Sequence, residues 1–126
     1  MADRINSFED LEAWKSAREF VRAVYAIFSG EPASRDFGLR DQAQRAAVSA
    51  MTNIAEGFER VHLAEKIQFY SVARASCGEV RSLGYVIADA GYITPQQQSE
   101  LQALAIRTGK LLSGLIQSTE ARKSSA

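Results

Sequence analysis

Apolar residues recur every three or four positions in four stretches of the chain, with polar residues between them. This spacing places the apolar side chains along one side of a helix. It predicts helices over residues 8–29, 36–58, 63–90 and 95–117. The remaining residues, 118–126, are mostly polar, and we expect this tail to fray. No segment has the alternating pattern of a strand.

Each predicted helix carries one apolar stripe. In the first it comprises Leu11, Trp14, Ala17, Val21, Val24, Tyr25 and Phe28. In the second, alanine dominates at positions 43, 46, 47 and 50, which would let a neighbouring helix approach closely. In the third it comprises Tyr70, Ala73, Cys77, Val80, Gly84 and Ile87, and in the fourth Leu101, Leu104, Ala105, Thr108, Leu111, Leu112, Leu115 and Ile116.

Residues that start and stop helices lie at the ends of these segments. Ser7 is a candidate N-cap of the first helix, and Thr94 with Gln97 forms a capping-box pattern before the fourth. Gly57 and Gly91 lie where the second and third helices should end. Short connections make successive helices antiparallel. The sequence therefore predicts an all-α protein, an up-down-up-down antiparallel four-helix bundle that forms a single domain over residues 1–126.

Charge and composition narrow the class of protein. Fifteen basic residues balance fifteen acidic ones, so no strong overall field attracts nucleic acid or a membrane. The only cysteine, Cys77, excludes an intramolecular disulfide and fits a reducing compartment. The N-terminal residues lack an apolar stretch, and no segment is apolar over the length of a membrane span. We expect a cytoplasmic protein with no membrane partner.

The sequence shows no catalytic or metal-binding pattern. His62 is the only histidine, and we expect it in the loop between the second and third helices. Cys77 lies on an apolar stripe, where cysteine usually serves as a small hydrophobic side chain. No Glu-x-x-His pair, phosphate loop or nucleophile elbow occurs. We therefore expect no enzymatic activity, no metal and no cofactor.

Polar residues gather on two helices. Arg45, Ser49, Thr52 and Glu56 share one face of the second helix beside Asn53, and Arg74 and Arg81 lie seven positions apart on the third. These residues form either a solvated surface with intrahelical ion pairs, or a polar seam between subunits or a phosphate site. The aromatic residues Trp14, Tyr25, Phe28, Phe69, Tyr70 and Tyr85 keep helical spacing, which favours core or interface positions over base stacking.

Three stretches together resemble a known family. They are FEDLEAWKSA at 8–17, RAAVSAMTNIAEGFER at 45–60 and QFYSVARASCGEVRSLGYVIADAGYIT at 68–94, of which residues 53–57 are the most specific. The pattern resembles the intervening-sequence proteins of 23S ribosomal RNA, to which the accessory proteins of diversity-generating retroelements are related. Members often carry proline where this chain has Met51.

The resemblance implies a bundle that assembles into a ring-like homopentamer and has no assigned enzymatic activity. On this basis we expect a homo-oligomeric scaffold or adaptor for an RNA or protein partner. Its candidate subunit-interface or channel residues are Arg45, Asn53, Glu56, Arg74 and Glu79. The alternative is an RNA-binding accessory module whose basic residues combine on the assembled oligomer. Its candidate residues are Arg40, Arg45, Arg60, Lys66, Arg74, Arg81, Arg107 and Lys110.

Overall fold

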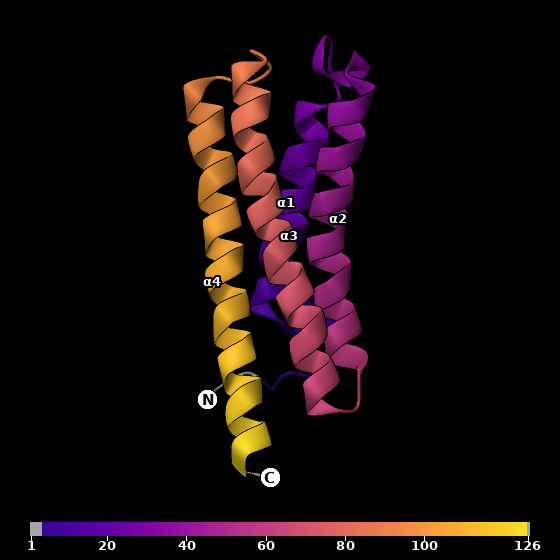
Figure 1. Ribbon diagram of the computed structural model, residues 1–126, viewed down its shortest axis with the longest axis vertical. Coiled ribbons are helices and arrows are strands. Elements are labelled where there is room, and N and C mark those ends of the chain that lie inside the picture. The colour runs from indigo at the N-terminus through magenta and orange to yellow at the C-terminus, as the bar shows by residue number, and fades with distance from the viewer. Residues whose placement is uncertain (1–3, 126) are drawn as a thin grey trace.

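Four long helices form an antiparallel bundle (Figure 1). The computed structural model describes residues 4–125. The helices are α1 (Glu12–Ile27), α2 (Phe37–Glu59), α3 (Leu63–Asp89) and α4 (Pro95–Ser125). The main packing pairs are α1 with α2, α2 with α3, α3 with α4, and α4 with α1, so the four helices close around one core. The predicted all-α four-helix bundle is confirmed.

Capping hydrogen bonds at the helix ends involve residues that the sequence identified. The backbone N–H of Gln97 donates to Thr94 Oγ1 at 3.1 Å, and the Thr94 N–H donates to Gln97 Oε1 at 2.8 Å. These reciprocal bonds satisfy two N–H groups at the start of α4. Asp36 caps α2 by accepting from the Leu39 N–H at 3.3 Å. Beyond α3, Gly91 has φ +81°, a left-handed conformation that favours glycine.

The predicted start of the first helix, at residue 8, is wrong. Residues Phe8–Asp10 form a separate 3₁₀ turn, η1, and Leu11 has extended backbone angles (φ −72°, ψ 128°) between this turn and α1. The Asp10 carboxylate causes the turn, because it accepts from the backbone N–H groups of Asn6 at 2.9 Å and Ser7 at 3.2 Å. Ser7 therefore caps η1 and not the long helix.

One member of the first apolar stripe was also misplaced. Tyr25 is 46% exposed, whereas Phe20, which the predicted stripe left out, is fully buried. The buried side of α1 runs through Ala13, Ala17 and Phe20 to Val24, so Tyr25 falls outside it.

The expectation that residues after 117 fray is wrong for the described part of the tail. Helix α4 continues to Ser125, and its C-terminal end extends past the neighbouring helices in Figure 1. Thr119 explains part of this, because its side chain is almost fully buried and its hydroxyl donates to the Leu115 carbonyl at 2.7 Å. Residues 1–3 and 126 of the predicted domain lie outside the described range.

Gly57 does not terminate α2, which runs on to Glu59. Its role is steric: a Cβ atom at this position would lie 2.6 Å from Cε1 and 2.8 Å from Cδ1 of the Tyr70 ring. The absence of a side chain therefore lets Tyr70 of α3 pack directly on the α2 backbone. Lys66 closes the end of α2, because its ammonium donates to the carbonyls of Gly57 at 3.3 Å and Phe58 at 2.5 Å.

The core has two clusters along the bundle axis. One surrounds Phe20, Val24 and Ile87, and the other surrounds Ile54, Tyr70 and Leu112. Most of the buried residues of α2 are alanines, as predicted: Ala43, Ala46 and Ala47 belong to the first cluster, and Ala50 joins Ile54 in the second. One buried polar pair crosses the core, where the hydroxyls of Ser16 and Thr108 lie 2.7 Å apart. Each hydroxyl thus has a partner, which offsets the cost of its burial.

Within residues 4–125, no helix combines the length and the apolar character that a membrane span requires.

Candidate functional site: a cationic groove between α3 and α4

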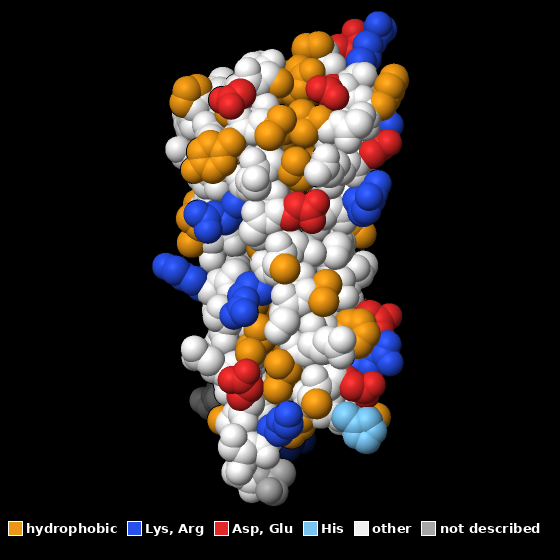
Figure 2. Space-filling view, in the orientation of Figure 1, with side chains coloured by type: hydrophobic (Ala, Val, Ile, Leu, Met, Phe, Trp, Pro, Cys, Tyr) orange, Lys and Arg blue, Asp and Glu red, His pale blue; other side chains and the backbone are white. Residues whose placement is uncertain are grey.

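A shallow groove of about 310 Å³ runs between α3 and α4 on the face shown in Figure 2. Two glycines, Gly78 and Gly109, leave its walls open, since a Cβ atom at either would meet no atom within 4 Å. The lining residues are Arg74, Cys77, Gly78 and Arg81 from α3, and Ala105, Ile106, Gly109, Lys110 and Ser113 from α4. We call this surface the α3–α4 groove.

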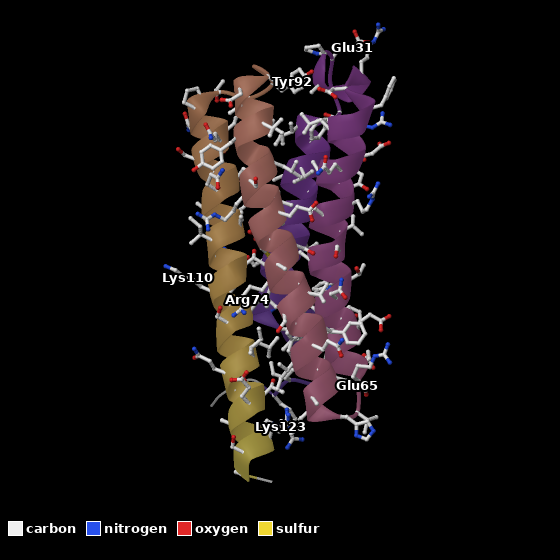
Figure 3. All side chains as sticks on the ribbon, in the orientation of Figure 1. Glu31, Glu65, Arg74, Tyr92, Lys110 and Lys123 are labelled. Atoms are coloured by element: carbon white, nitrogen blue, oxygen red, sulfur yellow. The ribbon has the colours of Figure 1, made fainter. Side chains whose placement is uncertain are left out.

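Three cationic residues line the groove, and the Lys110 side chain extends outward from α4 (Figure 3). Arg74 and Arg81 lie two turns apart on α3, about 10 Å along the axis at 1.5 Å per residue. Arg74 Nη1 donates to Ser113 Oγ across the groove at 3.4 Å, which places Ser113 level with Arg74. Because α4 runs antiparallel to α3, Lys110 lies about one turn from Ser113 in the direction of Arg81. Figure 3 shows Arg74 and Lys110 projecting from neighbouring helices at similar heights.

These cations have no acidic partners. None of the ion pairs found in residues 4–125 includes Arg74, Arg81 or Lys110. Figure 2 shows blue side chains along the middle of the α3–α4 seam, with a red side chain to their right. Unpaired cations that share a concave surface produce a positive potential there, which favours an anionic ligand.

Exposed apolar side chains lie in and beside the α3–α4 groove. Tyr85 follows Arg81 by one turn of α3 and is 58% exposed. Ile106 lines the groove on α4 and is also exposed. A solvent-exposed aromatic ring beside unpaired arginines offers a flat surface for a planar ligand group. Helical spacing favoured core or interface positions for Tyr25 and Tyr85. Both are exposed, so neither is a core residue.

The other predicted nucleic-acid-binding residues lie elsewhere and make other contacts. Arg40 pairs with Asp41 at 3.1 Å, Arg60 with Glu56 at 3.2 Å, and Arg107 with Glu19 at 3.7 Å. Lys66 caps α2, and Arg45 is exposed on α2. The structure therefore brings together three of the eight predicted cations, Arg74, Arg81 and Lys110, in one groove.

The predicted subunit-interface residues are also divided between surfaces. Asn53 is part-buried, and its amide donates to Ser49 O at 2.8 Å and to Ser49 Oγ at 3.1 Å. Ser49 Oγ in turn lies 2.9 Å from Ser76 Oγ of α3, so this polar seam joins α2 to α3 within one chain. Arg45, Glu56 and Glu79 are exposed, whereas Arg74 belongs to the α3–α4 groove.

The groove contains no activated nucleophile. Burial raises the pKa of the Cys77 thiol to about 11, so the reactive thiolate is scarce at neutral pH. His62, as expected, lies at the junction of α2 and α3, where it is exposed. Across residues 4–125, no three His, Cys, Asp or Glu side chains lie together as a metal site would require.

The state of Cys77 can be tested directly. In the folded protein at pH 8, we expect iodoacetamide to alkylate Cys77 at least about tenfold more slowly than in protein unfolded by guanidinium chloride, because the thiol is both buried and protonated. Mass spectrometry of quenched samples gives both rates. Equal rates would mean that Cys77 is accessible from the groove.

The fold and groove define a small all-α bundle with a charged surface site. A search of curated proteins finds no match. Among solved structures, the chain is similar to a protein of unknown function from the S23 ribosomal protein family of Bacteroides thetaiotaomicron, with a TM-score of 0.75 and 21% identity over 82% of this chain and 97% of that one. Residues 9–114 match the family described as 23S rRNA-intervening sequence protein. The chain therefore belongs to the family of 23S rRNA-intervening sequence proteins.

Proposed function

We propose that this chain is a non-enzymatic adaptor that binds the phosphate backbone of single-stranded RNA along the α3–α4 groove. The observation that carries the proposal is that Arg74, Arg81 and Lys110 line one groove and form no ion pair with an acidic residue in 4–125. Arginine and lysine contacts with phosphate supply most of the sequence-independent affinity for nucleic acid.

Two further features support a single strand as the ligand. Tyr85 lies one turn beyond Arg81, where an unpaired base could stack on its exposed ring. The neutral net charge of the chain leaves little attraction away from the groove, which favours local binding over coating of long duplexes. The family name refers to 23S rRNA, which makes RNA the first nucleic acid to test.

The test compares two triple variants that remove the same charge. Arg74→Gln with Arg81→Gln and Lys110→Gln should weaken binding of a fluorescent oligouridine by at least about tenfold in anisotropy titrations, because charge-assisted contacts are lost. The slope of log K against log salt should fall by about 0.7 for each lost phosphate contact. The control variant carries glutamine at Arg22, Arg45 and Lys123, which lie outside the groove. Equal weakening by both variants, or no binding by the wild type at low salt, would refute the proposal.

A second candidate function is a homo-oligomeric scaffold, expected to be pentameric, and one feature of α3 favours it. Val72, Glu79 and Val86 lie seven positions apart on the outer side of this helix, and both valines are nearly half exposed (45% and 49%). The exposed residues between them include Ala75 and Ser82, which are small. Apart from Glu79, this outward strip consists of valines and small side chains, which suit contact with a second copy of the chain.

Light scattering coupled to size-exclusion chromatography tests the scaffold. Wild-type protein should elute with a mass near five 13.8 kDa subunits. Val72→Asp with Val86→Asp should reduce that mass, because two buried carboxylates would be placed in the contact. Val61→Asp is the control, since Val61 is more exposed than either valine and lies in the α2–α3 loop. A wild-type monomer would refute this second function while leaving the RNA proposal standing.

A further inference from the structure

A second cavity lies at the end of the bundle where α2 stops and α3 starts. It encloses about 370 Å³ and is less open than the α3–α4 groove. Its walls come from the N-terminal segment, the last turn of α2, the first turns of α3 and the last third of α4. The volume falls within the range of about 300–1,000 Å³ that is typical of small-molecule sites. We call it the end cavity.

One side of the end cavity is apolar. Ile5, Leu11, Phe58 and Leu115 line it, and they come from four different segments of the chain. Leu11 is held there by the extended backbone between η1 and α1. An apolar wall of this kind can accept a hydrocarbon body but supplies no hydrogen bonds.

The other side carries two cations and a phenol. Lys66, Tyr70 and Arg122 all line the cavity. The Lys66 ammonium is held in place by the Gly57 and Phe58 carbonyls, which use two of its three donor positions. Neither Lys66 nor Arg122 forms an ion pair with another residue in 4–125. The three groups thus face the same volume from α3 and α4.

Tyr70 is the most constrained of these groups. Its side chain is 2% exposed and its ring is packed on Gly57. Its hydroxyl is not among the buried polar atoms that lack a partner in residues 4–125, and Tyr70 lines the cavity, so the hydroxyl is accessible to a molecule bound there. The pKa of Lys66 is lowered, first by burial and then by the nearby Arg122 charge. Glu59 opposes this shift, and an anion in the cavity would add to its effect by compensating the two cations while it accepts a hydrogen bond from the phenol.

We infer that the end cavity binds a small amphipathic carboxylate, with its apolar body against Ile5, Leu11, Phe58 and Leu115 and its head between Lys66, Tyr70 and Arg122. The planar carboxylate matches the planar guanidinium fork of Arg122, and its second oxygen can accept from the Tyr70 hydroxyl and the free donor of Lys66. This site is separate from the α3–α4 groove, because the two share no lining residue.

Titration calorimetry with octanoate tests the inference. Octanoate should bind to the full chain, and octanamide, which has the same body without the charge, should bind at least about tenfold more weakly. Arg122→Gln should weaken octanoate binding by about tenfold, and Tyr70→Phe should weaken it as well while keeping the ring on Gly57. The matched control is Lys123→Gln, which removes a neighbouring charge that does not line the cavity.

The outcomes separate this site from the RNA site. Arg74→Gln, in the α3–α4 groove, should leave octanoate affinity unchanged. Substitution of Lys66 would also uncap α2, so it would change the stability of the bundle together with ligand binding. If octanoate does not bind, if octanamide binds equally well, or if Arg122→Gln and Tyr70→Phe both leave the affinity unchanged, the inference is overturned.

Discussion

Replacing Phe20 with alanine should lower the free energy of unfolding by about 3–5 kcal/mol. Phe20 is fully buried in the core cluster that contains Val24 and Ile87. The buried residues that α2 contributes to that cluster are alanines, whose side chains are too short to extend into the space that the ring leaves. The cavity would therefore remain, and its cost adds to the lost burial of the ring. Urea denaturation followed by circular dichroism measures the difference.

Tyr25→Ala is the matched control for this substitution. It removes an aromatic ring of similar size from the same helix, but Tyr25 is half exposed. Its effect should stay within about 0.5 kcal/mol, as for most surface positions. Similar losses at the two positions would contradict the assignment of Phe20 to the core and Tyr25 to the surface.

Replacing Gly57 with valine should destabilise the protein by about 3 kcal/mol. The first added carbon would lie 2.6 Å from the Tyr70 ring, and Tyr70 is itself buried, so the ring has little room to move. The gain in helix propensity over glycine is below about 1 kcal/mol and does not offset this overlap. Thermal and urea unfolding of the same variant measure the loss.

Gly114→Val provides the comparison, because a Cβ atom at Gly114 in α4 would meet nothing within 4 Å. Its stability should be unchanged or slightly raised. Combining Gly57→Val with Tyr70→Leu should recover part of the lost stability, because leucine lacks the ring atoms that would overlap the valine side chain. Equal effects of valine at positions 57 and 114, or no recovery in the double variant, would show that Tyr70 does not set the requirement for glycine.

The sequence predicted those parts of the fold that depend on local chemistry. The capping pair of Thr94 and Gln97 is specified by residues three positions apart, and the stripes of α2 and α3 follow from helical periodicity. The failures concern features that apolar periodicity does not report. Hydrogen bonds from Asn6 and Ser7 to the Asp10 carboxylate form a separate turn before α1, and the continuation of α4 past Gln117 accompanies the burial of Thr119.

The candidate site shows the same division. Arg74 and Arg81 were identifiable as neighbours on one helix face, because they are seven positions apart. Lys110 could not be joined to them from the sequence, since this requires the rotation of α4 and its register against α3. The hydrogen bond between Arg74 and Ser113 fixes that register. The end cavity was missed for the same reason, because its walls combine the N-terminal segment, the α2–α3 junction and the last part of α4, which are distant in the chain.

The unpaired cations of the α3–α4 groove affect how the whole molecule rotates in an external electric field. Fifteen basic and fifteen acidic residues cancel overall, so the rest of the chain carries three more acidic than basic residues. Three unpaired positive charges on one side of a neutral body contribute to its electric dipole moment. Near a polyanion, such a body experiences a torque that turns the groove toward the surface before contact. Orientation during approach, and not overall attraction, would then set the rate of encounter.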